Sequence, residues 1–135
     1  MNKSIAHKAE RKKLIKELDK IVGDWIKKRD GWTCQRCGST TKQLNACHFY
    51  SREGKAIRWE PLNITTLCVG CHFWGHKNPL GFVRWYSEKM GKEKMDILEL
   101  KKRNRLKTSL VNLQMIKQIM LQQIQEGTFG EGSMF

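Results

Sequence analysis

The residues with the clearest capacity for chemistry are two cysteine pairs of identical spacing. Cys34 and Cys37 form the first Cys-x-x-Cys pair, and Cys68 and Cys71 form the second. Thiolates at this spacing can both turn toward one tetrahedral Zn²⁺, and two such pairs complete a four-cysteine site that needs no water ligand. We therefore predict a structural zinc site at these residues, in preference to four unrelated buried cysteines.

Histidines and one asparagine follow a pattern around the same cysteines. His48 and Asn63 lie between the two pairs, His72 directly follows the second pair, and His76 comes one helical turn later. A neutral imidazole can take a proton from water near neutral pH, and two histidines at i and i+4 can offer their rings to one metal ion. The set favours a hydrolytic centre, with a helix-end His76 that binds no metal as the alternative.

Composition restricts the class of protein. The chain has 135 residues, enough for one domain with a modest core, and 39% of them are hydrophobic. No apolar run is long enough to predict a membrane span, and the basic N-terminus lacks the apolar block of a secretory signal. We therefore expect a soluble, cytoplasmic protein whose cysteines are metal ligands and not disulfides, because that compartment is reducing.

The charge balance points to a polyanionic partner. The chain has 26 Lys and Arg against 13 Asp and Glu, a net charge of +13. Basic side chains that pair with phosphates release condensed counterions, so DNA is the leading candidate partner. A basic surface that only keeps the protein soluble is the alternative. An anionic membrane surface fits less well, because the basic runs lack an aromatic-rich apolar face.

Periodicity and turn residues place the elements that must position these groups. Residues 9–29 are predicted to form an amphipathic helix, with lysines around its solvated face and a frayed segment at 1–8. After a zinc knuckle that Gly38 closes, residues 43–50 and 56–59 are predicted to pair as a hairpin with a long loop. A helix over residues 67–76 follows, and Asn78-Pro79 ends it.

The C-terminal part of the chain reads as helices. We predict a helix over 82–90, a second from about 93, a basic patch at 101–107 and an apolar face at near-heptad steps over 110–121. Packing of this face on the protein's own core is the default, and a homodimer through it is the alternative. Aromatic residues are interpreted as core and not as a base-stacking platform: Trp59, Phe73, Trp74, Trp85 and Tyr86.

Two family resemblances rest on these motifs. The order Cys-x-x-Cys, Ala-Cys-His48, Asn63 and Leu-Cys-x-x-Cys-His72 resembles the HNH endonucleases, with their ββα-metal fold and accessory zinc. The runs RDGWTCQRCGS, CHFYSREGKAIRWEPLN and LCVGCHFWGHKNP are similar to the phage NinG/Rap recombination proteins, structure-specific DNA endonucleases. The likeness covers roughly residues 28–90.

The resemblance implies a fold and a division of the chain. The fold would be α+β, a small ββα-metal (HNH) core with the four-cysteine zinc site, flanked by N-terminal and C-terminal helices. The expected parts are a basic helix at 1–31, the zinc-stabilised core at 32–78, C-terminal helices with the basic patch at 79–126, and a flexible tail at 127–135.

The resemblance also implies residue roles. His48 would be the general base that activates water, Asn63 would orient the histidine loop, and His72 would bind a catalytic divalent ion, either Mg²⁺, Mn²⁺ or another. One departure concerns the residue before the base, where many HNH enzymes have a metal-binding Asp or His and this chain has Cys47. The second ligand is then His76 or Cys47, with a buried strand residue as the third reading of Cys47.

The implied reaction is phosphodiester hydrolysis in branched recombination intermediates, such as Holliday junctions and D-loops, inside a bacterial host. Guanidinium groups suit phosphate oxygens, so Arg52 is the first choice as a substrate clamp and Arg58 the second, with plain surface charge as the alternative. The predicted DNA-binding residues are Arg52, Lys55, Arg58, Lys101, Lys102, Arg103 and Arg105.

Two other functions remain open at this point. A zinc-stabilised DNA-binding protein without catalysis explains the cysteines and the charge, but leaves the order of His48, Asn63 and His72 as coincidence. A protein-interaction module built on the C-terminal helices explains neither feature. The metal-dependent DNA endonuclease is therefore the function that we predict from the sequence.

Overall fold

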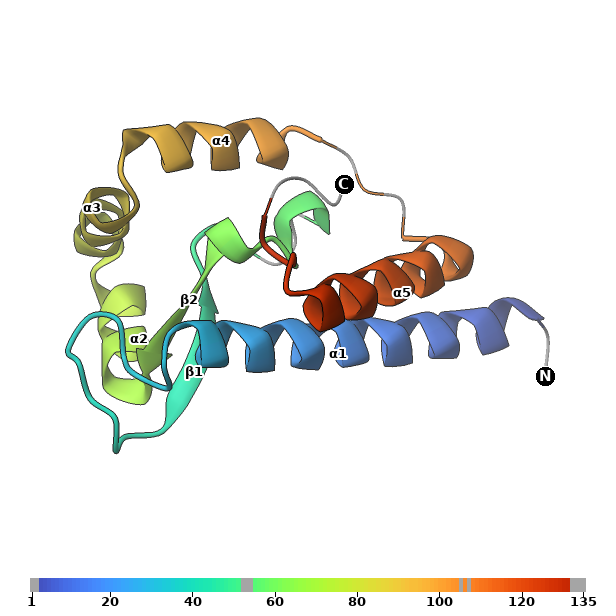
Figure 1. Ribbon diagram of the computed structural model, residues 1–135, viewed down its shortest axis with the longest axis horizontal. Helices are drawn as coiled ribbons and strands as arrows, with labels where there is room; N and C mark the ends of the chain where they lie inside the picture. The colour runs from blue at the N-terminus through green and yellow to red at the C-terminus, as the bar shows by residue number, and fades with distance from the viewer. Residues whose placement is uncertain (1–2, 52–54, 105, 107, 132–135) are drawn as a thin grey trace.

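The computed structural model describes residues 3–51, 55–104, 106 and 108–131, which form five α-helices and one two-stranded sheet. The elements in chain order are α1 (Lys3–Arg29), β1 (Leu44–His48), β2 (Ile64–Cys68), α2 (Val69–Lys77), α3 (Pro79–Met90), α4 (Lys92–Lys102) and α5 (Leu110–Glu126) (Figure 1). Two short 3-10 helices, η1 (Lys55–Ile57) and η2 (Pro61–Asn63), lie between the strands. The predicted mixed α+β class is confirmed.

The long helix α1 carries one side of the core. Leu18, Val22 and Ile26 are its buried residues, spaced so that they share one face. The helix starts at Lys3, so the prediction of a frayed segment at 1–8 is wrong for residues 3–8. Neither glycine nor proline interrupts this segment, and Arg11 Nε donates to the Thr108 carbonyl at 2.7 Å, which ties the helix to the C-terminal part.

The hairpin at the centre differs from the predicted one. β1 pairs antiparallel with β2, Leu44 opposite Cys68 and His48 opposite Ile64, so the predicted partner strand at 56–59 is wrong. Ile57 and Trp59 are buried without a ladder, and Pro61 opens η2 in front of the true strand. β2 contains Ile64, Thr65 and Thr66, β-branched residues that favour a strand.

The two faces of the hairpin meet different neighbours. Ala46 and Ile64 pack in the cluster that includes the buried face of α1. Cys47 and Leu67 belong to a second cluster, together with the cysteines of the knuckle and of α2. The predicted helix at 67–76 starts two residues later, at Val69, because Cys68 is its N-cap and its Sγ accepts from Cys71 N.

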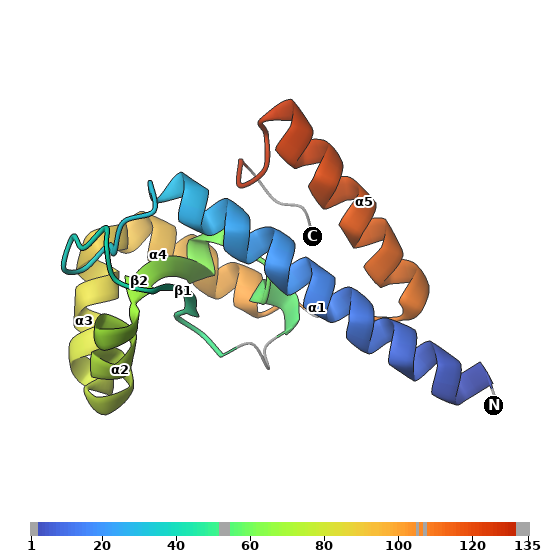
Figure 2. The same ribbon diagram turned by 90° about the horizontal axis from the view of Figure 1, so that it is seen from below.

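The C-terminal helices fold back onto the first half of the chain. α3 and α4 lead away from α2 and return over the β1–β2 connection, where Lys101 Nζ pairs with Glu60 Oε2 at 2.9 Å. α5 then runs in the same direction as α1 (Figure 2), with Lys117 Nζ 2.7 Å from Glu17 Oε2. Leu113, Ile116 and Met120 of α5 are buried in the α1 cluster, so the predicted apolar face is used within the chain.

Part of the predicted flexible tail is packed. The chain leaves α5 through Gly127 in the left-handed conformation, and the Phe129 side chain is 4% exposed. Its ring meets Trp25 edge-on, with the ring centroids 4.7 Å apart. The expectation of a mobile 127–135 segment is therefore wrong at Phe129, while residues 132–135 lie outside the described ones.

Within the described ranges, no helix is both long and apolar enough to cross a membrane.

Phe129→Ala tests whether the segment after α5 completes the core. Removal of a buried phenylalanine should lower the free energy of unfolding by about 3 kcal/mol, from lost burial and the cavity left behind. Urea denaturation followed by circular dichroism measures this. The matched control is Phe73→Ala, because Phe73, predicted to be core, is 61% exposed and should cost under about 0.5 kcal/mol. Equal effects of the two changes would contradict the packing of Phe129.

Candidate functional site

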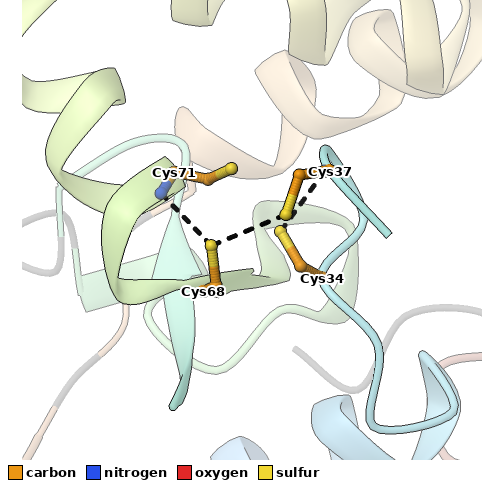
Figure 3. Close-up of side chains that lie close together, drawn as sticks. All are labelled: Cys34, Cys37, Cys68 and Cys71. Atoms are coloured by element: carbon orange, nitrogen blue, oxygen red, sulfur yellow. Dashed lines mark hydrogen bonds between the residues drawn. The ribbon is translucent and has the colours of Figure 1, made fainter. Parts of the chain in front are cut away.

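The four cysteines of the two pairs converge on one point. Their sulfur atoms all lie within 4.8 Å of one another, and the Cys37 and Cys68 sulfurs are 3.7 Å apart (Figure 3). A tetrahedral Zn²⁺ with bonds of about 2.3 Å holds its sulfurs about 3.8 Å from one another. The cluster therefore fits a structural zinc ion, and the prediction that these four residues can hold a metal is confirmed.

The two pairs share the same local hydrogen bond, in which the backbone N–H of the second cysteine donates to the sulfur of the first. Cys37 N donates to Cys34 Sγ at 3.5 Å, and Cys71 N donates to Cys68 Sγ at 3.4 Å. In the knuckle, Gly38 adopts φ 78° and its N–H donates to the Cys34 carbonyl at 2.9 Å, a turn that a side chain would strain. In α2, the same contact is the N-cap of the helix.

Electrostatics prepares the cluster for a cation. Burial opposes ionisation of Cys34, but backbone N–H groups of Cys37, Cys68 and Arg36 outweigh it and lower the pKa of the thiol to about 6. Burial raises the pKa of Cys71 to about 12. The four sulfurs therefore do not all ionise near neutral pH on their own, and binding of Zn²⁺ must release protons.

Arg36 supports the cluster from outside and was not singled out from the sequence. Its guanidinium carbon lies 3.5 Å from the centroid of the Trp74 ring, and its Nη1 is 3.5 Å from Cys71 Sγ. A cation in this position offsets the negative charge that four thiolates and one Zn²⁺ would carry. No local pattern signals the contact, because Trp74 is far away in the sequence.

A groove of about 830 Å³ lies beside the zinc cluster and contains the predicted catalytic histidines. His48 comes from the end of β1, and His72 and His76 come from α2. The other groove residues include a polar set and an apolar set: Lys27, Asn45 and Ser51, and Phe49, Pro79, Phe82 and Val83. The fold thus brings together all three histidines that the sequence assigned to the site.

His72 and His76 are placed as a pair. Their Nε2 atoms are 3.0 Å apart, and His72 Nδ1 is 3.2 Å from Asn45 Nδ2. Two imidazole nitrogens bound to one ion at about 2.1 Å lie about 3.0–3.4 Å apart, so the spacing of the pair fits two neighbouring ligands of one metal. Because Asn45 Nδ2 can only donate, the neutral His72 ring has its proton on Nε2 here, and metal binding at Nε2 requires the other tautomer with the Asn45 amide turned to offer its oxygen. Burial, and then the charge of His76, lower the pKa of His72, which keeps its ring in the neutral form that a metal requires.

Cys47 has a different position from that of a ligand. The side chain is 3% exposed, and its Sγ donates to the Asn45 carbonyl at 3.7 Å. Burial raises the pKa of the thiol to about 12, so it stays protonated. In the described part of the chain, the four zinc-site cysteines are the only group of three or more ligand side chains. Cys47 borders the groove but fits its reading as a small buried strand residue, and the identity of the second ligand stays a prediction.

His48 is oriented by a backbone carbonyl. Its Nε2 lies 2.8 Å from the Arg58 carbonyl oxygen, which can only accept a hydrogen bond. Nε2 must therefore carry the proton, and in the neutral ring the lone pair is on Nδ1. Nδ1 is then the atom through which His48 could act as a base.

Asn63 holds the segment that follows His48. The side chain is fully buried, its Nδ2 donates to the carbonyls of Tyr50 and Ile57, and its Oδ1 accepts from Tyr50 N at 2.8 Å. Phe49 N also donates to the Asn63 carbonyl at 2.8 Å. This arrangement provides the loop orientation that was predicted for Asn63, while its effect on catalysis stays a prediction.

Arg58 has a structural partner in place of the predicted phosphate contact. Its Nε and Nη2 donate to the two carboxylate oxygens of Asp19 at 2.8 and 2.6 Å. No local pattern signals this pair, because Asp19 lies on α1, far from Arg58 in the sequence. Arg52 lies outside the described residues, and Lys55 opens η1 but its side chain also lies outside them.

The predicted basic patch at 101–107 is divided in the structure. Lys101 is 18% exposed and pairs with the buried Glu60, so it holds α4 on the connection, and its contact with DNA stays a prediction. Lys102 is exposed, with its Nζ 4.2 Å from the centre of the Tyr50 ring, and Arg103 makes only an exposed pair with Glu99. Arg105 lies outside the described residues.

Lys27 is a groove residue that the sequence placed on the solvated face of α1. The side chain is half-buried in the last turn of the helix and borders the same groove as the three histidines. Among the residues that the structure describes, it has no carboxylate partner.

Comparison with known proteins gives one match. The family model described as "Bacteriophage Lambda NinG protein" matches residues 2–128, which include the hairpin, the cysteine cluster and the helices on both sides. The chain gives no match to a curated protein or to a solved structure.

Cys68→Ser should remove the zinc site and with it much of the fold. A structural zinc ion contributes folding free energy outright, so we expect less than one zinc per chain and a loss of helical signal in circular dichroism. Cys47→Ala is the matched control, because Cys47 is equally buried but outside the cluster, and it should keep a full zinc content. A folded, zinc-free Cys68→Ser protein would contradict the structural role.

Proposed function

The chain belongs to the bacteriophage lambda NinG protein family, and from that premise we propose that it is a metal-dependent DNA endonuclease of the HNH type. Its substrates would be branched recombination intermediates, in which it hydrolyses phosphodiester bonds. The observation that carries the proposal is the single groove in which His48, His72 and His76 meet beside the cysteine cluster.

The order of elements supports an HNH reading. The general base of such a site lies on the first strand, the asparagine before the second strand, and the metal ligand on the helix that follows. His48 ends β1, Asn63 ends η2 immediately before β2, and His72 lies in α2. A DNA-binding protein without catalysis needs no such convergence, and this is the reason for ranking it second.

The residues of the groove divide the work. His48 would take a proton from the attacking water at Nδ1, with its ring held by the Arg58 carbonyl and its loop by Asn63. His72 and His76 would hold the divalent ion, which withdraws charge from the transition state and stabilises the leaving 3′ oxygen. Two imidazole ligands favour Mn²⁺ or a similar transition metal over Mg²⁺, which prefers oxygen ligands.

Lys27 would contact the scissile phosphate in place of Arg58. Arg58 is held by Asp19, whereas Lys27 borders the groove and is not paired with a carboxylate in the described residues. An ammonium group in a partly water-excluded groove interacts more strongly with a phosphate than one in bulk water. This assignment keeps a cation at the cleavage site without breaking the structural ion pair.

His48→Ala is the decisive test of the enzyme reading. We expect it to keep the zinc, the fold and the DNA affinity, while the single-turnover cleavage rate on a branched DNA falls about 10²–10⁴-fold. His7→Ala is the control, because His7 is exposed in the second turn of α1 and does not line the groove. If His48→Ala cuts at the unmodified rate, the zinc-stabilised DNA-binding protein becomes the better account.

His72→Ala and His76→Ala should show a different defect. Each removes one ligand of the ion, so the concentration of Mn²⁺ required for half-maximal rate should rise, and excess Mn²⁺ should restore part of the activity. Titration of the cleavage rate with Mn²⁺ measures this. An unchanged requirement in His76→Ala would leave His72 without its proposed partner.

DNA affinity should depend on salt through the exposed basic residues. With several phosphate contacts, log K for duplex DNA falls with log salt by about 0.9 per phosphate neutralised. The double change Lys102→Gln and Arg103→Gln should reduce this slope by about two contacts without loss of stability. Lys101→Gln should instead lower the unfolding free energy, because it leaves the buried Glu60 unpaired. Fluorescence anisotropy at several salt concentrations and urea denaturation separate the two effects.

A further inference from the structure

A small polar cavity lies between α1 and the hairpin, on the α1 side of His48. Its volume is about 80 Å³, and its polar side chains are Asp19, His48 and Arg58. The rest of its lining is apolar, with Val22 and Ile64 among its residues. His48 therefore borders two spaces, the large groove where the substrate would lie and this internal one.

Among the described residues, Arg58 and Trp59 together donate three hydrogen bonds to the Asp19 carboxylate. Its Oδ1 accepts from Arg58 Nε at 2.8 Å and from Trp59 Nε1 at 2.9 Å, and its Oδ2 accepts from Arg58 Nη2 at 2.6 Å. The donors belong to two consecutive residues. Both side chains of the Arg58-Trp59 pair are thus fastened to one point on α1.

The backbone carbonyl between those two fastened side chains is the one that orients His48. It belongs to Arg58 and accepts the hydrogen bond of His48 Nε2 at 2.8 Å. Because a carbonyl can only accept, its position decides which ring nitrogen is protonated and which keeps the lone pair. Asp19 therefore acts on His48 indirectly: it holds the Arg58 side chain, and the backbone carbonyl of the same residue holds the His48 ring.

We propose that Asp19 is a positioning residue, which fixes the Arg58 carbonyl and thereby holds the neutral His48 ring with its proton on Nε2 and its lone pair on Nδ1. The kinetic part of this proposal rests on the proposed nuclease function, whereas the tautomer of His48 is a property of the protein alone.

A role in general packing does not account for the arrangement. The connection between the strands is already tied to α1 by Arg29, which donates to the carbonyls of Pro61 and Ile64 at 2.9 and 2.8 Å. It is also anchored by Trp59 in the main apolar cluster. Asp19 binds both side chains that flank one carbonyl, and so it adds orientation at that carbonyl. The Arg58–Asp19 ion pair is only partly buried and contributes little net stability by itself.

The direct test is the protonation pattern of His48 in protein labelled with ¹⁵N-histidine. At about pH 8, where an ordinary imidazole is neutral, two-bond ¹H–¹⁵N correlation spectra distinguish the two tautomers. We expect Nε2–H in the unmodified protein and a mixture of tautomers in Asp19→Ala. Asp24→Ala is the matched control, because Asp24 lies on the same helix in an exposed pair with Lys20, and it should leave the pattern unchanged.

Two further variants separate orientation from folding. Asp19→Asn keeps one oxygen acceptor at the same place, and should stay folded even where Asp19→Ala does not; a partial tautomer shift is expected. Trp59→Phe removes one donor and some packing but leaves the Arg58–Asp19 pair, so it should lower stability while His48 keeps Nε2–H. A His48 that keeps Nε2–H in every folded Asp19 variant would overturn the proposal.

Single-turnover cleavage of a branched DNA completes the test. Misplacement of a base by a fraction of an ångström should lower the rate in Asp19→Asn by on the order of 10–100-fold, with unchanged DNA affinity. If the unmodified protein cuts no DNA, the nuclease proposal ends. If the Asp19 variants nevertheless shift the tautomer of His48, the role of Asp19 is still supported. A tautomer shift with an unchanged cleavage rate would overturn that role.

Discussion

The four-sulfur cluster is the constraint on which the rest of the structure depends. It joins the knuckle at residues 34–37 to the end of β2 and the first turn of α2, and so it helps to fix the direction in which α2 leaves the sheet. That direction decides where His72 and His76 face relative to His48. If the four sulfurs separated, α2 could shift relative to β1, and the groove between them would lose its shape. The cluster therefore both stabilises the fold and sets the geometry of the site.

Helix α1 is the second element on which the site depends, because it contributes side chains to the core, to the Arg58-Trp59 segment and to the groove. Its buried stripe forms the core, Asp19 fastens the Arg58-Trp59 segment, Lys27 borders the groove, and Arg29 holds the connection. The helix that looked in the sequence like a basic surface element is therefore a part of the site. Charge at its outer face remains available for the polyanion that the net charge of +13 favours.

The sequence was sufficient where the chemistry is local. Cys-x-x-Cys spacing identifies the zinc cluster because two thiolates of one turn must share one ion, and the i, i+4 step of His72 and His76 places them on one helix face. Sequence analysis was wrong where one local pattern fits two structures. Ile57 and Trp59 alternate as in a strand, but Ile57 is buried as part of a 3-10 helix and Trp59 as part of a turn. Contacts between Asp19 and Arg58, Asn45 and His72, or Lys101 and Glu60 join residues far apart in sequence, and no single-chain pattern announces them.

The packing of Phe129 has a consequence for how the chain is made. The cysteine cluster and its apolar neighbours draw only on residues 34–85, so that part can close as soon as those residues have left the ribosome and met zinc. The face of α1 is different, because it is covered by α5 and finally by Phe129. Until that residue emerges, Trp25 lacks its edge-on partner, and the part of the α1 face that α5 covers stays open to solvent. During synthesis, the cluster around the four cysteines can therefore fold first, and the core around α1 is completed last.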